Sequence, residues 1–330
     1  MYNATLKERF LKTYPEDTAM VYRNSLIQID EAEQNHDCDC FNFSVDELDA
    51  AFKTIRSRSL GGVRTIVSPV LEYIRWANQQ GFVKSKIDIT PLFNGEKLKE
   101  YIWDYASKNR YIYREELYAI CDNLINFVDK SILVLVFEGV LGKDYHELTN
   151  LKFSDIDFGT GEMILTDVDG VVREVTIAHQ KSLDILKECK YETTYLIGNG
   201  DVDLKCRMKE FDLLETPYVI RKIERCAKGD EMSPVSNGFL LQKIIRFFRG
   251  KVDNNGFVIK EPFISDAVFL SLKSIYTSGF FDCCMELEKQ KGGTLETEDY
   301  KKACIRYGIN LSSLQTYKGR YLDWKDSASE

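Results

Sequence analysis

Helical spacing of apolar residues dominates this chain, and strand-like spacing is confined to one short stretch. Along residues 18–33, 44–55 and 63–80, apolar side chains recur every three or four positions, which is the pattern of an amphipathic helix. Ser44 and Glu47 form a capping box at the start of the second of these helices. The sequence therefore predicts a helical N-terminal domain.

The helical period is lost between residues 82 and 95, a segment that contains Pro91. A chain of 330 residues is long for one average domain and comfortable for two. We therefore expect residues 1–90 to form one domain and residues 91–330 a second.

The second domain is expected to mix helices with a single hairpin. A helix starting at Arg114 precedes the apolar run 132–137. Residues 162–166 and 171–178 then alternate as strands do, on either side of the turn sequence Asp-Val-Asp-Gly at 167–170. The predicted fold class is mainly α with a small antiparallel β-sheet.

Charge and composition exclude some classes of protein. The chain has 44 Lys and Arg against 52 Asp and Glu, so its net charge of −8 argues against a protein that coats nucleic acid over its whole surface. A basic stripe on an acidic body remains possible, so the charges must be examined locally. The longest apolar run is residues 132–137, which is far shorter than a membrane span. The nine cysteines and the polar N-terminus predict reduced, buried thiols in a cytoplasmic protein.

One block has a resemblance to a known family. Gly142-Lys143-Asp144, Glu147-Leu148, Leu151 and Asp155-Ile156, followed by the hairpin, resemble the corresponding block of the tyrosine recombinases, the phage integrase family. The likeness covers most of residues 44–325 and lies mainly in the order of the elements. It implies a two-domain tyrosine-recombinase-like clamp around duplex DNA, with a helical core-binding domain and a catalytic-like α+β domain.

The residues that strand cleavage requires do not match. A cleaving member uses a Tyr nucleophile, two Arg that hold the phosphoryl group, and Lys and His for proton transfer. Asp144 stands at the position of the first Arg and Lys273 at the position of the second, and the hairpin has no Lys. Tyr317 and Tyr321 are the candidate vestigial nucleophiles. We therefore expect no enzymatic activity.

The resemblance extends to a lineage of integrase-like master repressors in SPβ-type Bacillus prophages. It implies a sequence-specific DNA-binding transcriptional repressor that maintains prophage lysogeny, located in the cytoplasm of a bacterial host and associated with the nucleoid. Its partner would be double-stranded operator DNA, with no membrane; a small regulatory protein or self-association stays open. Two alternatives remain. One is a diverged, active recombinase that uses Lys143, Arg173 and Lys273 as substitute cations, and the other is a protein-interaction module.

The candidate phosphate contacts are basic residues that occur in short clusters. They lie in the acid-free run 52–69, in the segment after residue 82, on the basic amphipathic stretch 240–251, and at the second-Arg position, although each cluster could also be an ordinary solvated surface. These candidates are Lys53, Arg56, Arg58, Arg64, Lys84, Lys86, Lys243, Arg246, Arg249, Lys251 and Lys273.

No cofactor or metal is expected. The segment His36–Cys40 is rich in ligand-type residues but is not followed by the second ligand pair of a zinc site. The sequence also contains no phosphate-binding loop and no dinucleotide fingerprint.

Overall fold

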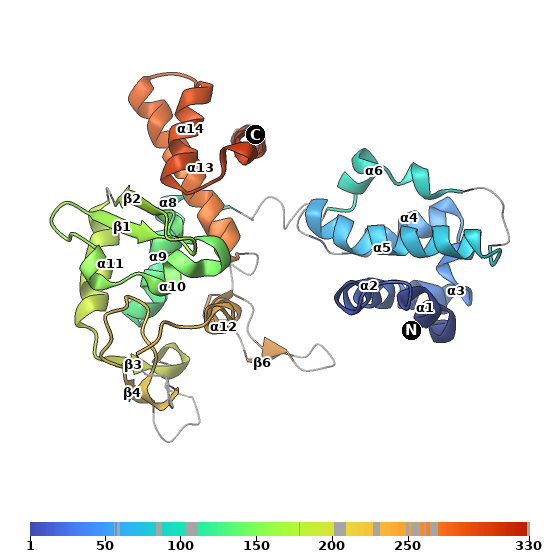
Figure 1. Cartoon of the computed structure of the whole chain (residues 1–330), viewed down its shortest axis with the longest axis horizontal. Helices are drawn as coiled ribbons and strands as arrows, with labels where there is room; N and C mark the ends of the chain where they lie inside the picture. Colours follow the sequence, from blue (N-terminus) through green and yellow to red (C-terminus); the bar gives the residue numbers. More distant parts are fainter. Residues whose placement is uncertain are drawn as a thin grey trace. The chain divides into compact units, whose positions relative to one another are not determined.

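The computed structural model describes residues 1–55, 57, 60–83, 88–102, 111–177, 179–200, 209–226, 232–248, 251–252, 258–260, 262–264 and 270–328. These residues are mostly helical and include three two-stranded antiparallel sheets (Figure 1). The chain divides into two compact units, residues 1–110 and 111–330, each with its own hydrophobic core. The predicted fold class is thus confirmed. In the described part of the chain, no helix has the length and apolar character needed to cross a membrane.

The first unit is helical, as predicted. Its elements are α1 (Ala4–Leu11), α2 (Glu16–Gln28), α3 (Asp30–His36), η1 (Cys40–Asn42), α4 (Val45–Lys53), α5 (Leu60–Gln79), η2 (Thr90–Leu92) and α6 (Gly95–Lys99). The capping box is present: the Ser44 hydroxyl accepts from the Glu47 amide, and the Glu47 carboxylate accepts from the Ser44 amide. Buried apolar residues at helical spacing on α5 form the centre of this core.

The first unit continues beyond the expected boundary at residue 90. The rings of Phe52 and Phe93 meet edge to face with centroids 5.3 Å apart, and Leu98 of α6 is buried in the same core. Tyr101 donates a hydrogen bond of 2.8 Å to Asp49 on α4. These contacts join residues far apart in the sequence, so a local loss of helical period does not reveal them.

The second unit is built around one largely buried helix, α9. Its elements are α8 (Arg114–Asp122), α9 (Phe127–Phe137), η3 (Lys143–Tyr145), α10 (His146–Asn150), η4 (Phe153–Asp155), β1 (Glu162–Thr166), β2 (Val172–Thr176), α11 (Gln180–Tyr191), β3 (Thr194–Leu196), η5 (Ile197–Gly200), β4 (Glu210–Asp212), η6 (Glu224–Cys226), α12 (Asn237–Phe248), β5 (Lys251–Val252), β6 (Val258–Lys260), α13 (Leu272–Lys291), α14 (Thr297–Arg306), η8 (Leu311–Ser313) and α15 (Leu314–Ala328). α9 carries the apolar run and packs against α8, α11 and α13.

α9 and α13 approach each other so closely that one position tolerates no side chain. A Cβ atom added to Gly279 on α13 would lie 1.7 Å from the carbonyl oxygen of Phe137 at the end of α9. The same oxygen accepts a hydrogen bond of 2.8 Å from the hydroxyl of Tyr307, which follows α14. The ends of α9 and α14 and the middle of α13 are therefore fixed together.

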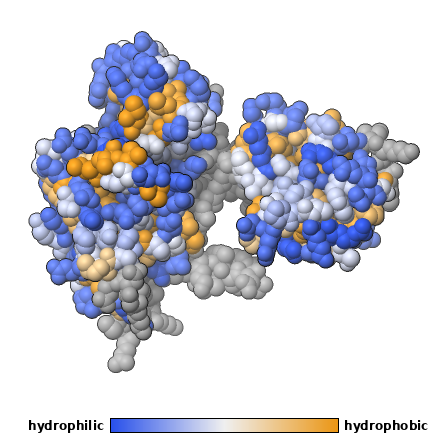
Figure 2. All heavy atoms as spheres, viewed as in Figure 1, coloured by the Kyte–Doolittle hydropathy of each residue, from blue (hydrophilic) through white to orange (hydrophobic). Residues whose placement is uncertain are grey.

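The predicted hairpin is present as β1 and β2. Met163 pairs with Val175 and Leu165 with Arg173 on the side that faces the core. The opposite face and the tip expose Ile164, Val168, Val171 and Val172, each at least half exposed. Figure 2 shows this apolar patch over the hairpin. Two further small sheets, β3–β4 and β5–β6, were not expected.

Candidate functional site

The block that resembles the first-Arg segment of the recombinases begins with an irregular turn. Asp144 (φ 51°) and Tyr145 (φ 62°) both adopt the left-handed backbone conformation, which costs about 1–3 kcal/mol for each such residue. The Asp144 side chain is exposed. A carboxylate at this position repels a phosphate, where an Arg would bind it.

Arg173, on β2, is fully engaged inside the unit. Its Nε donates to Glu147 Oε1 (2.8 Å), and its Nη2 donates to Glu147 Oε2 (2.6 Å) and to the carbonyl of Gly139 (2.7 Å). Its Nη1 donates to the carbonyl of Arg306. All three guanidinium nitrogens thus have internal acceptors, and the Glu147 carboxylate is buried. Arg173 joins the hairpin to α10 and α14 instead of presenting a free cation.

A second buried ion network lies beside it. Arg114 donates to Glu138 Oε1 (2.5 Å) and to Asp282 Oδ2 (2.5 Å), and Arg306 donates to Glu138 Oε2 (3.0 Å). Burial acts to lower the pKa of Arg114, but the two carboxylates raise it above its ordinary value. Burial also raises the pKa of Asp282, against the opposing effect of Arg114. This network fixes α8, α9, α13 and α14 to one another.

The two candidate nucleophile positions, Tyr317 and Tyr321, differ in access. Tyr321 is fully buried, and burial, together with the nearby Glu288 carboxylate, raises its pKa. Tyr317 is half-buried, with its ring 5.2 Å from that of Phe280 on α13, and burial raises its pKa as well. Deprotonation of either hydroxyl is therefore less favourable than in water.

Lys273 lies in the first turn of α13 and is exposed. Ser271 caps this helix by accepting a hydrogen bond from the Ser274 amide. The exposed ammonium group therefore lies beside the positive end of the helix dipole, a combination that suits an anion.

The amphipathic stretch predicted to bind DNA is α12, and the structure corrects one of its residues. Lys243 is buried, and its Nζ donates to Asp129 Oδ1 (2.7 Å) and to the Tyr195 hydroxyl (2.5 Å). Burial lowers its pKa. Lys243 shares the core-facing side of α12 with Leu240 and is therefore not available to a phosphate, because the spacing of basic residues alone does not say which side faces the core.

The other candidates have varied positions. Lys53 is exposed but forms an ion pair of 2.6 Å with Asp49, whereas Arg64 and Arg246 are exposed on α5 and α12. The backbone of Lys251 belongs to β5. Arg56, Arg58, Lys84, Lys86, Arg249 and the side chain of Lys251 lie outside the described residues. All of these basic residues except Lys243 stay predictions.

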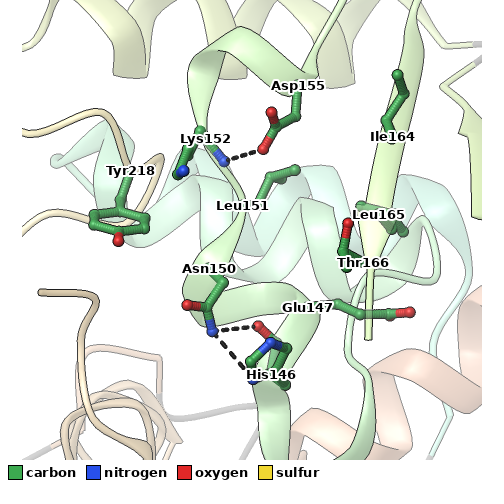
Figure 3. A pocket seen from close by; sticks show the side chains of 10 residues that line it. All are labelled: His146, Glu147, Asn150, Leu151, Lys152, Asp155, Ile164, Leu165, Thr166 and Tyr218. Carbon is green, nitrogen blue, oxygen red and sulfur yellow. Dashed lines mark hydrogen bonds between the residues drawn. The ribbon is translucent and has the colours of Figure 1, made fainter. Parts of the chain in front are cut away.

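A polar pocket of about 270 Å³ lies beside α10 (Figure 3). His146 and Asn150 of α10, Thr166 of β1, and Lys152 and Tyr218 line it. Asn150 donates 2.9 Å to the His146 carbonyl, so part of its amide is already used. Glu147 and Asp155 also line it, so acidic as well as basic residues surround the pocket.

Among the residues that the structure describes, two groups of side chains have the composition of metal ligands. His179, Asp282 and Glu286 form one of them. The His179 Nε2 is 2.7 Å from Glu286, and Asp282 already accepts from Arg114. A metal ion here would have to compete with a buried Arg.

The second group, Glu33, Asp39 and Cys40, includes two residues of the segment that we expected not to bind metal. The buried ammonium of Lys7 pairs with Glu33, and Tyr73 donates 2.8 Å to Asp39. Burial raises the pKa of the Cys40 thiol, which favours the protonated form. A cation of the chain itself therefore already occupies this neighbourhood.

Sequence reasoning missed most of the buried ion network. Glu138 directly follows the apolar run 132–137, and a lone acid in such a place indicates a buried partner. The identity of that partner could not be read from the sequence, because Arg306 lies 168 positions away.

The chain has one helical unit and one α+β unit, and the β1–β2 hairpin of the second unit lies between α10 and α11. This arrangement is that of a two-domain protein of the tyrosine-recombinase class. The chain belongs to the MrpR family: residues 111–326 match the MrpR C-terminal catalytic domain, and residues 1–79 match the MrpR N-terminal core-binding domain.

Individual relatives are more distant. The SPbeta prophage-derived uncharacterized protein YopR of Bacillus subtilis (strain 168) is 26% identical over 298 residues, which cover 88% of this chain and 84% of the relative. Among solved structures, the Tn1549 transposon integrase in complex with a circular intermediate DNA is similar with 11% identity and a TM-score of 0.43, covering 95% of this chain and 93% of that one. XerA recombinase is similar with 12% identity and a TM-score of 0.32, covering 96% and 98%.

Proposed function

We propose that this protein is a sequence-specific DNA-binding repressor that maintains prophage lysogeny and does not cleave DNA. The observation that carries the proposal is the state of the cations around the vestigial centre. Asp144 stands where the first Arg would be, and the guanidinium nitrogens of Arg173 already donate hydrogen bonds to Glu147 and two backbone carbonyls.

Cleavage and binding make different demands on cations. The transition state of phosphoryl transfer needs two or more cations converging on one phosphate, whereas binding needs only outward-facing cations spaced along the duplex. Arg64 in the first unit and Arg246 and Lys273 in the second are exposed and form no ion pair with any described carboxylate, so each is free to contact DNA. A scaffold of the recombinase class with such residues supports DNA binding without chemistry.

The repressor role itself rests on the resemblance to integrase-like prophage repressors. Membership of the MrpR family and the prophage origin of the YopR relative support it. The partner would be operator DNA of the phage genome, in the cytoplasm and at the nucleoid of the host.

A diverged recombinase is the second candidate, because the hydroxyl-bearing Tyr317 is only half-buried and Lys273 is exposed. Tyr317 packs on Phe280, which is seven residues, or about 10 Å of helix, from Lys273. This reaction would still lack the pair of Arg that grips the phosphoryl group.

A single experiment separates the candidates. Purified full-length protein is incubated with fragments of its own phage locus, and mobility shifts are measured over a series of salt concentrations. The same samples are then run on denaturing gels, which retain covalent protein–DNA adducts. The Tyr317→Phe variant is treated in parallel.

A salt-sensitive, sequence-selective shift without an adduct is the result expected of the repressor. An adduct that disappears in Tyr317→Phe would establish an active recombinase and overturn the proposal. The absence of any shift at low salt across the whole locus would instead support the protein-interaction module.

A further inference from the structure

The exposed face of α12 has the composition of a surface that reads DNA bases. Gln242 and Arg246 are four residues apart and both exposed, with Leu241 and Ile245 exposed beside them at 47% and 42%. Residues 232–252 contain no Asp or Glu. With Lys243 turned inward, the described residues 241–246 of this face present one Arg, one Gln and two aliphatic side chains.

These side chains have no internal task in the described part of the chain. No described carboxylate forms an ion pair with Arg246, and no described group forms a hydrogen bond with the Gln242 amide. The neighbouring buried cation, Lys243, is balanced by Asp129 rather than by a surface acid. As far as the described residues go, the Arg246 guanidinium and the Gln242 amide therefore keep their hydrogen-bonding capacity for an external partner.

The core side of α12 holds this face in a fixed orientation. Lys243 forms hydrogen bonds to Asp129 on α9 and Tyr195 on β3, and Phe247 and Phe248 are fully buried. A base-reading side chain needs such a rigid support, because small displacements abolish bidentate hydrogen bonds. The buried Lys thus has a use in positioning the exposed side of the same helix.

We propose that α12 reads base edges in the major groove of the operator, with Arg246 on a guanine and Gln242 on an adenine. Arg pairs bidentately with the O6 and N7 of guanine, Gln pairs with the N6 and N7 of adenine, and aliphatic groups contact the thymine methyl group. An α-helix fits the major groove. Residues four apart are separated by about 6 Å along a helix, so the two bases lie about two steps apart at 3.4 Å per step.

This inference rests on the proposed DNA-binding function and adds the element that supplies specificity. The test uses full-length protein, a footprinted operator from its own phage locus, and a scrambled duplex of equal length and composition. Affinities for both duplexes are measured at one salt concentration for wild type, Gln242→Ala, Arg246→Lys and Gln290→Ala. Gln290 is an exposed glutamine near the end of α13 and serves as the matched control. Thermal melting by circular dichroism checks that every variant is folded.

We expect Gln242→Ala and Arg246→Lys each to weaken operator binding about tenfold or more without changing the affinity for the scrambled duplex. Arg246→Lys keeps the charge but loses the planar fork, so it also becomes indifferent to substitution of one G·C pair. Gln242→Ala becomes indifferent at an A·T pair about two steps away.

Equal losses on both duplexes would mean phosphate contacts, and unchanged operator affinity would mean that α12 faces away from the bases; either result overturns the inference while the repressor stands. If wild type itself shows no preference for the operator, the proposed function fails and the inference fails with it.

Discussion

Among the described residues of the second unit, two sets of cations contrast: one is turned into the unit and paired, and the other is exposed. Arg114, Arg173 and Arg306 point inward and pair with Glu138, Glu147 and Asp282. Arg246 and Lys273 point outward and pair with no described carboxylate. The inward set stabilises the packing of helices around α9, and the outward set is free for a partner. In the sequence, both sets are simply positive charges. Only the three-dimensional structure separates the cations that stabilise the fold from those that are available to a partner.

The largest effect on stability is expected when a member of the inward set, Arg114, is removed. Arg114→Ala would leave the carboxylates of Glu138 and Asp282 buried with one cation fewer, so we expect a loss of about 3–5 kcal/mol in the free energy of unfolding. Urea denaturation followed by circular dichroism measures it. Lys289→Ala, an exposed cation on α13, is the control and should change stability little. A similar effect for both variants would contradict the inward role of Arg114.

Lys243→Met tests the residue that the sequence assigned to the wrong set. Removal of the ammonium leaves Asp129 buried with only the Tyr195 hydroxyl as a partner, and we expect a loss of about 3 kcal/mol in unfolding free energy. The salt dependence of DNA affinity should stay that of wild type under conditions where the variant is folded. A weaker salt dependence of DNA affinity in the variant would mean that Lys243 contacts a DNA phosphate and belongs to the outward set.

Asp49 in the first unit is an intermediate case, because its ion pairs with Lys53 and Lys97 are only partly buried. It is mostly buried between Lys53, Lys97 and Tyr101; burial acts to raise its pKa, but the hydrogen bonds from these groups lower it well below the usual 3.8. A group with a lowered folded pKa stabilises above its unfolded pKa and loses this effect as the pH falls.

Asp49→Asn should therefore destabilise the protein by about 1 kcal/mol at pH 7, a value kept small because the ion pairs are partly exposed. The difference from wild type should shrink as the pH falls below about 4, as measured by urea denaturation at several pH values. A difference that grows at low pH would mean that the pKa of Asp49 is raised rather than lowered.

The smallest effect is expected at Tyr317, the more accessible candidate nucleophile. Tyr317→Phe keeps the ring contact with Phe280 and removes only the hydroxyl, so operator affinity should stay within about twofold of wild type. Repression of a reporter gene in cells gives the functional readout. A complete loss of repression in this variant would show that the hydroxyl has a role that binding alone does not require.

Elements with strong local signals could be predicted from the sequence. The capping box at Ser44, the long helix ending before Gly81 and the hairpin at residues 162–176 follow from spacing and turn chemistry, and the structure confirms them. The order of these elements also predicted the recombinase class to which the MrpR family models point.

Features that depend on distant partners could not be predicted. The limit of the first unit depends on Phe93 and Tyr101 packing against α4. The engagement of Arg173 depends on the Arg306 carbonyl, 133 positions away, and the burial of Lys243 depends on Asp129, 114 positions away. Local periodicity carries no information about such pairs.

The engagement of Arg173 has an evolutionary consequence. Replacing Asp144 by Arg would restore one cation, yet Arg173 would still be held by Glu147 and two backbone carbonyls. Releasing Arg173 would in turn loosen the hairpin from α10 and α14. If the protein is the non-cleaving repressor proposed above, its lineage would regain strand cleavage only through several coupled substitutions, each of which alone costs stability or restores no activity. For the proposed repressor, the step from a cleaving to a non-cleaving scaffold would therefore be hard to reverse.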